Sequence, residues 1–189
     1  MTDLVMFDRV ILGNAIAKIS KALMTIPSLV DWQIGGFLVL GYGVLALILG
    51  YATGLIRFQL VESWPLATRI LSNSLFAPAL LEEMIFRVSL LPLPTGNLEQ
   101  LPWLSVIASI VLFVIYHPLN ALTFFPQGRS LFWRPIFLVL AGLLGVVCLL
   151  GYWLSRSLWL PVTIHWLVVS CWLILGDGHS LLYQEATKD

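Results

Sequence analysis

The sequence predicts an all-α, polytopic integral membrane protein with about five transmembrane helices and an amphipathic, interfacial helix at its amino terminus. Hydrophobic residues make up 59% of the 189 residues and charged residues only 11%. The mean hydropathy is +0.94. Soluble domains carry roughly 25% charged residues, so this chain has too few charges to coat a surface that faces water. Its apolar residues also gather in runs long enough to cross a bilayer.

Residues 1–33 are expected to form an interfacial helix, which covers about residues 4–26. Lysines beside an apolar stripe are typical of a helix that lies at the boundary of the lipid headgroups. A helix that binds a protein partner is the competing interpretation. The polar face holds Asn14, Lys18, Lys21 and Thr25.

Residues 34–57 are expected to add a transmembrane helix outside the core of the domain. From Ile34 to Ile56 the chain has 23 residues without a charge. A helix of about 20 residues spans the roughly 30 Å of hydrocarbon in a bilayer. This run is therefore long enough to cross.

Residues 64–175 are expected to form the core, with four helices, and residues 176–189 a polar tail. The turn from Pro92 to Asn97 ends the first of these helices, and Pro118 ends the second. The stretch 119–131 is interpreted as a loop or an interfacial segment. The four helices are expected at about residues 66–91, 102–117, 132–154 and 159–175.

Three charged residues lie near the middle of the first core helix: Glu82, Glu83 and Arg87. A charge at the centre of a membrane helix costs about 2.5–3.5 kcal/mol, so each needs a partner or a use. Glu83 and Arg87 have the i, i+4 spacing that favours an ion pair. Glu82 lies about 100° round the helix and has no cation nearby in sequence. It is the residue that the pattern leaves free for chemistry.

His117 and His165 lie in apolar stretches of two other core helices. A lone histidine in such a helix is often a hydrogen-bonded packing group, so neither ring is assigned a role by itself. At about 1.5 Å of rise per residue, however, Glu82 and the two histidines fall within about 13 Å of one another in depth. We therefore expect the three side chains to line one polar cavity.

These residues resemble the three motifs of the CPBP family, which comprises the CAAX prenyl endopeptidases and the bacteriocin-processing or self-immunity (Abi) proteins. Glu82-Glu83-x-x-x-Arg87 is followed about 30 residues later by Phe113-x-x-x-His117, and His165 comes from the last core helix. The resemblance covers about residues 64–175. It implies a glutamic-type intramembrane endopeptidase that uses no metal.

The resemblance also implies roles for these residues. Glu82 would be the general base, His117 would help to hold and polarise the water, and His165 would stabilise the oxyanion. Glu83, Arg87 and Phe113 would support the site. The family often has asparagine four residues after its last histidine, where this chain has Val169; Asn120 is a candidate substitute.

The residue types fit this chemistry without the resemblance. A carboxylate held in low dielectric is a stronger base near neutral pH, and peptide hydrolysis needs a donor aimed at the developing oxyanion. One acid and two histidines supply both. The same set could bind zinc, although its spacing is not that of the HExxH motif.

Two other functions stay open at this point. A proteolytically inactive membrane assembly or scaffold protein would keep the fold, and Val169 allows this alternative. A proton-coupled carrier is less favoured, because no inverted repeat is evident. The expected partners are membrane lipid, a membrane-associated peptide or protein substrate, and a membrane protein complex. Ten basic residues balance ten acidic ones, so no net charge attracts nucleic acid.

Overall fold

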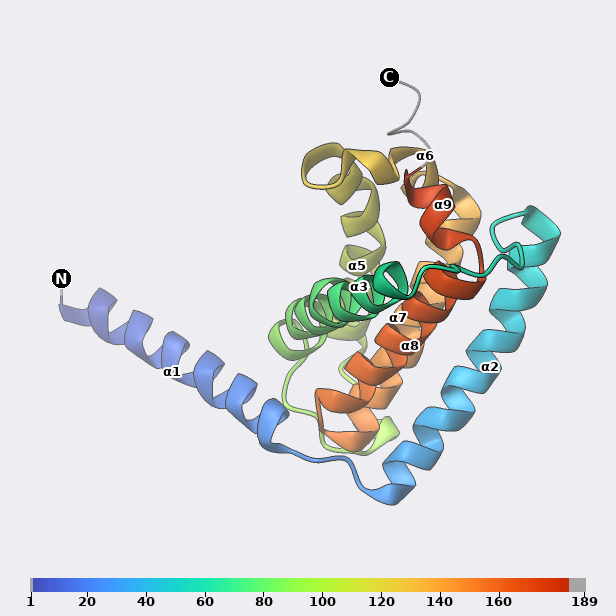
Figure 1. The fold of residues 1–189 in the computed structure, drawn as a ribbon. Helices are drawn as coiled ribbons and strands as arrows, with labels where there is room; N and C mark the ends of the chain where they lie inside the picture. The colour runs from blue at the N-terminus through green and yellow to red at the C-terminus, as the bar shows by residue number, and fades with distance from the viewer. Residues whose placement is uncertain (1, 184–189) are drawn as a thin grey trace.

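The protein is a bundle of helices, shown in Figure 1 as a computed structural model that describes residues 2–183, with side chains described for residues 13–183. Within these residues no β-strand forms, and the only extended pairing is an isolated bridge between Gln59 and Gly176. This confirms the expected all-α fold class. The α-helices are α1 (Thr2–Met24), α2 (Leu29–Thr53), α3 (Trp64–Ser74), α4 (Leu81–Glu83), α5 (Trp103–Thr123), α6 (Arg129–Phe132), α7 (Pro135–Ser155), α8 (Trp159–Leu175) and α9 (Gly178–Tyr183).

Three of these helices, α2, α5 and α7, are long and apolar enough to cross a membrane, and α8 is apolar but shorter. Helix α7 lies at the centre of the bundle, where it packs against α2, α5 and α8. Large apolar side chains on α2 and α5 are exposed, for example Phe37 and Leu104. Such an apolar surface suits contact with lipid rather than water, as expected for a polytopic membrane bundle.

Helix α2 begins at Leu29, five residues before the start expected at Ile34. Ser28 and Asp31 form a capping box. The Ser28 hydroxyl accepts from the Asp31 N–H at 3.2 Å, and the Asp31 carboxylate accepts from the Ser28 N–H at 2.7 Å. These bonds satisfy N–H groups that the first turn leaves open. The charge on Asp31 interrupts the apolar run, which is why hydropathy placed the start too late.

The segment from Trp64 to Ser89 is an irregular helix that is interrupted by a kink. The kink lies between α3 and α4, within Leu75–Leu80, and after α4 the chain forms a π-helical turn (Met84–Ser89). Ala77 leaves helical geometry, with φ −137° and ψ 97°, because the proline that follows it disfavours the α conformation. π-helical turns are frequent at functional sites. Here the kink and the π-helical turn lie on either side of the two glutamates.

Helix α5 continues through Pro118 to Thr123, so the prediction that it ends at His117 was wrong. The stretch 119–131, expected as a loop or interfacial segment, consists mostly of helical turns. It contains the end of α5, a 3-10 turn (Pro126–Gly128) and the first residues of α6. Membrane helices tolerate an internal proline where neighbouring groups satisfy the freed backbone. Another 3-10 turn (Leu98–Gln100) precedes α5.

The amino-terminal end of helix α1 extends away from the bundle, and the carboxyl-terminal end of α1 contacts the bundle (Figure 1). There the Leu158 N–H donates to the Ala22 carbonyl at 3.0 Å, and the Trp159 indole donates to the Leu23 carbonyl at 2.8 Å. Both bonds satisfy carbonyls that the last turn of a helix leaves open. The α7–α8 connection therefore anchors α1, and its interfacial role stays a prediction.

Residues 57–61 run as an extended strap across the carboxyl-terminal end of α8. The Gln59 N–H donates to the Leu175 carbonyl at 3.0 Å, and the Val61 N–H donates to the Ile174 carbonyl at 2.9 Å. The segment after α8, expected to be a polar tail, begins with the short helix α9, whose Leu182 is buried. This end of α8 is therefore covered on both sides.

Candidate functional site

Glu83 is fully buried and is held by two partners from different elements. Its Oε1 accepts a hydrogen bond from Nδ1 of His165 on α8 at 2.9 Å. Its Oε2 lies 3.0 Å from Nε of Arg87, in an ion pair outside hydrogen-bond geometry. The i, i+4 spacing predicted the Arg87 contact, whereas the His165 contact was not expected. Glu83 therefore ties the irregular helix to α8.

Glu82, the next residue along the chain, is also buried, but its surroundings differ. Its Oε2 has no hydrogen-bond partner, and the nearest ring nitrogen, Nε2 of His165, is 3.9 Å away. That distance is too long for a direct hydrogen bond. The His165 imidazole thus lies between the two carboxylates, bonded to one and facing the other.

His117 reaches the same region from α5. Its Nδ1 lies 2.9 Å from the carbonyl oxygen of Phe113. A carbonyl can only accept, so this Nδ1 carries the proton and Nε2 offers a lone pair. The Phe113 ring packs edge-on against both histidine rings, with centroids 5.0 Å from His117 and 5.9 Å from His165. Phe113 therefore separates and orients the two imidazoles.

Ser109 and Cys148 are neighbours of the site that the sequence analysis missed. Nη1 of Arg87 donates to the Ser109 hydroxyl at 3.0 Å, and that hydroxyl donates to the Phe86 carbonyl at 2.6 Å. Ser109, Phe113 and His117 follow one face of α5 at i, i+4 and i+8. A serine at that spacing in an apolar helix was the signal that could have found it.

One group of possible metal ligands occurs among residues 13–183, formed by Glu83, Cys148 and His165. One ligand atom from each lies within 4.8 Å of the others, and all three residues are buried. Arg87 already neutralises Glu83 from the other side, and a cation bound there would face that guanidinium. The set is therefore better suited to an ion pair than to a metal ion. The Cys148 thiol points to the Pro161 carbonyl at 3.7 Å, as a packing group would.

Neither Val169, which stands where the family often has an asparagine donor, nor Asn120, the candidate substitute, joins the buried cluster. Val169 is half-buried and packs against an aliphatic cluster around α7. The Asn120 backbone carbonyl accepts from the N–H groups of Phe124 and Phe125 at the end of α5. No hydrogen bond links the Asn120 side chain to Glu82, His117 or His165 in the part of the chain with described side chains. The expected second donor is therefore not in place.

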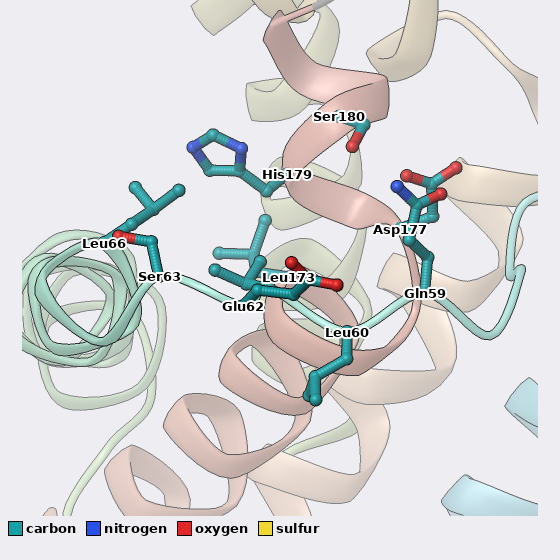
Figure 2. Close-up of a pocket in the computed structure, with 10 residues that line it drawn as sticks. Gln59, Leu60, Glu62, Ser63, Leu66, Leu173, Asp177, His179 and Ser180 are labelled. Atoms are coloured by element: carbon teal, nitrogen blue, oxygen red, sulfur yellow. The ribbon is translucent and has the colours of Figure 1, made fainter.

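A separate pocket lies between the strap and the segment after α8 (Figure 2), with a volume of about 200 Å³. Glu62, Asp177 and His179 are among its lining residues, and none of the three predicted catalytic residues is. Burial, and then the charge of Arg69, lower the pKa of His179 below its usual range. With Glu62 and Asp177 in its lining, the pocket has two acidic side chains, and it is distinct from the buried cluster of glutamates and histidines.

Comparison with known proteins gives one match. No curated protein and no solved structure matches the chain. The family model described as "Type II CAAX prenyl endopeptidase Rce1-like" matches residues 62–171, which is more than half of the chain. The matched range runs from the end of the strap into α8 and includes Glu82, His117 and His165. The chain therefore belongs to the Rce1-like family of type II CAAX prenyl endopeptidases, and it is an integral membrane protein of the CAAX protease type.

Proposed function

We propose that this protein is an intramembrane endopeptidase that hydrolyses a peptide bond of a membrane-associated peptide or protein. Glu82 is the general base for the attacking water, His117 holds that water, and His165 donates to the oxyanion. Glu83, Arg87 and Phe113 keep the histidines in place. The observation that carries the proposal is the buried Glu82 oxygen that has no partner and faces Nε2 of His165 at 3.9 Å.

An unpaired carboxylate oxygen is costly in a protein interior, because burial removes its water without supplying another hydrogen bond. Such groups are rare and need a reason. The gap between Glu82 and His165 is longer than one hydrogen bond, and a molecule beside it could bond to both groups. A water molecule or the carbonyl of a peptide has the required polarity.

The reaction follows from these positions. Glu82 takes a proton from the water while the water oxygen attacks the peptide carbonyl carbon. The carbonyl oxygen then becomes negative. With its Nδ1–H bonded to Glu83, a His165 that also carries a proton on Nε2 can donate to that oxygen. The carbon–nitrogen bond then breaks, and the proton held by Glu82 passes to the leaving amine. Two peptide ends result, one acid and one amine.

His117 contributes through its fixed tautomer. Because Nδ1 donates to the Phe113 carbonyl, Nε2 is the ring atom that can accept from water. The ring is further confined by the aromatic side chains of Phe113, Phe132 and Phe137. A water molecule bonded to this nitrogen and to Glu82 would be held for attack, without a metal ion.

The same proposal assigns parts to the chain. Helices α2, α5 and α7 cross the membrane, and the irregular segment 64–89 and α8 complete about five spans. Residues 64–175 form the peptidase core, residues 1–33 lie on the membrane, residues 34–57 add a span, and residues 176–189 follow the core. This division rests on the length and hydropathy of each segment.

Val169 favours a second candidate, a proteolytically inactive assembly or scaffold protein with the same fold. A valine cannot donate the hydrogen bond that asparagine would supply, and one such donor is worth about 100- to 1,000-fold in rate. An assembly protein would need the fold but not the Glu82 carboxylate. Glu82→Gln therefore separates the two candidates.

The test compares membranes from cells that produce the wild-type protein, Glu82→Gln or the control Glu99→Gln. New peptide amino termini are labelled and identified by mass spectrometry, so no substrate has to be known beforehand. Glu99 lies in an exposed turn. Termini present with the wild type and Glu99→Gln, and lost with Glu82→Gln, support the peptidase. Identical termini in all three membranes contradict it and favour the assembly protein.

A further inference from the structure

A continuous line of buried contacts leads from α5 through the irregular helix to His165. It begins at Ser109, whose side chain bonds to Arg87 at 3.0 Å. Arg87 contacts Glu83 at 3.0 Å, and Glu83 accepts from His165 at 2.9 Å. All four residues are at most 2% exposed. The line therefore connects three helical segments without contact with solvent or lipid.

The direction of the hydrogen bonds at Ser109 is fixed. Its single hydroxyl proton goes to the Phe86 carbonyl at 2.6 Å, so its lone pairs face Arg87. The Phe86 carbonyl is one of the last four carbonyls of the irregular helix, which a helix end leaves open. The N–H groups of Leu90 and Leu91 both donate to the Arg87 carbonyl instead. The carboxyl-terminal end of this helix thus supplies the acceptor for Ser109.

Ser109 limits how the Arg87 guanidinium can turn. Nε faces Glu83, Nη1 faces Ser109, and the carbon between them lies 5.0 Å from the centre of the Phe113 ring. Without Ser109, the guanidinium would keep only one polar contact and could rotate about it. The Arg87 charge beside Oε2 of Glu83 would then no longer be fixed, and the Glu83 carboxylate could rotate as well.

We propose that Ser109 is a positioning residue, which acts through Arg87 and Glu83 to keep the Nδ1–H of His165 bonded to Glu83. Nε2 is then the ring atom that faces Glu82 and that takes the second proton needed for donation to the oxyanion. The effect of Ser109 on the histidine ring does not depend on what the protein hydrolyses. Its effect on turnover rests on the proposed peptidase function. The two effects can therefore be measured separately.

The first measurement is nitrogen NMR of the protein with labelled histidine in lipid nanodiscs, at a pH where the rings are neutral. The chain has three histidines, so substitution of each to glutamine assigns the signals. In the wild type we expect His165 in the Nδ1–H form. In Ser109→Ala the ratio of the Nδ1–H to the Nε2–H form should fall by about fivefold, the size of one lost hydrogen bond. The signals of His117 and His179 should not change.

The matched control is Ser170→Ala. Like Ser109, Ser170 is a buried serine, but it lies on α8, the helix that carries His165. Its hydroxyl bonds to that of Ser74 at 2.8 Å, so the control also removes a buried hydrogen bond of a serine. Thermal melting checks that both variants fold. If Ser170→Ala changes the His165 signal as much as Ser109→Ala does, or if neither changes it, the proposal is overturned.

Arg87→Lys gives a second variant in case Ser109→Ala does not fold. A lysine cannot contact Glu83 and Ser109 at once in the way a guanidinium can. It should therefore shift His165 in the same direction as Ser109→Ala. An unchanged His165 signal in a folded Arg87→Lys protein overturns the proposal as well.

The second measurement uses a peptide that spans a cleavage site found by the labelling of new termini. Ser109→Ala should lower kcat by about 10- to 100-fold, as misplaced groups do, and leave KM within about twofold of the wild type. Ser109→Thr, which keeps the hydroxyl, should recover most of the rate. A raised KM with unchanged kcat contradicts the positioning role. A different result would contradict the proposed peptidase function: cleavage of the peptide that continues in Glu82→Gln.

Discussion

The buried polar cluster has two halves that differ although they begin from adjacent glutamates. Around Glu83 every carboxylate oxygen faces a nitrogen, from His165 on one side and Arg87 on the other. Neither Glu82 Oε2 nor Glu83 Oε2 makes a hydrogen bond, but the nitrogen closest to Glu82 Oε2 is 3.9 Å away, against 3.0 Å for Glu83 Oε2. Both side chains are less than 10% exposed, so burial alone does not explain the difference.

This comparison indicates which half of the cluster stabilises the fold and which half is available for catalysis. The Glu83 half joins the irregular helix, α5 and α8, so it stabilises their arrangement. The Glu82 half leaves a buried carboxyl oxygen without a hydrogen bond, which folding alone does not favour. We infer that the first half positions His165 and that the second half uses it. The predictions that follow set the two halves against each other, from the largest expected effect to the smallest.

Glu83→Gln should destabilise the protein by about 3–5 kcal/mol, because it leaves the Arg87 charge buried without a carboxylate. Chemical unfolding in lipid bicelles measures the change, with the exposed Glu99→Gln as control. A loss below about 1 kcal/mol would mean that Arg87 has another anionic partner, and the Glu83 half would then not be the structural one.

Val169→Asn should raise the cleavage rate by about 100-fold, at the low end of what one oxyanion donor contributes. Residue 169 lies one helical turn after His165, so an amide there can reach the same region. The rate is measured with the peptide used for Ser109, and Val168→Asn on the next face of α8 is the control. An equal rise in both variants would point to a general effect of polarity on α8.

Gly145→Ala should lower the free energy of unfolding, measured in the same bicelles, by about 1 kcal/mol relative to Gly43→Ala. A Cβ at Gly145 would lie 3.1 Å from the Phe113 ring and 3.5 Å from Nη2 of Arg87, whereas a Cβ at Gly43 meets nothing within 4 Å. Both changes gain the same helix propensity, which removes that term from the comparison. Equal stabilities would show that Phe113 and Arg87 have room to move, which would weaken the case for a fixed Glu83 half.

Removal of metal ions should have the smallest effect. A chelator such as 1,10-phenanthroline should leave cleavage within about twofold of the untreated rate, since Arg87 already compensates the Glu83 charge and the mechanism needs only protons. The measurement repeats the peptide assay with and without the chelator. Loss of cleavage that zinc restores would replace the metal-free mechanism with a metal-assisted one.

The sequence predicted the parts that depend on composition and short spacing. The all-α membrane fold followed from long uncharged runs, and the Glu83–Arg87 pair followed from its i, i+4 spacing. Helix ends were less predictable. Asp31 hid the start of α2 because it is charged, and Pro118 suggested an end to α5 that the structure does not have. Both errors come from treating one residue as a signal when its neighbours satisfy the backbone.

The site was predictable only in part, because contacts between helices have no counterpart in local spacing. Glu82 and His165 were expected in one site, and they face each other. The bond from His165 to Glu83 and the role of Ser109 could not be read from the chain, since each depends on how α8 and α5 pack against the irregular helix. The open Phe86 carbonyl that Ser109 uses also depends on where the helix ends, which sequence predicts less well. Tertiary packing decided these features.

The most direct test of this account is the unfolding free energy of Glu82→Gln, measured in the same bicelles as Glu83→Gln. The account predicts that Glu82→Gln is as stable as the wild type or more stable, because the variant replaces a buried acid whose Oε2 makes no hydrogen bond. A loss of about 3–5 kcal/mol, like that expected for Glu83→Gln, would show that Glu82 holds the fold together, and its assignment as the reacting base would be contradicted.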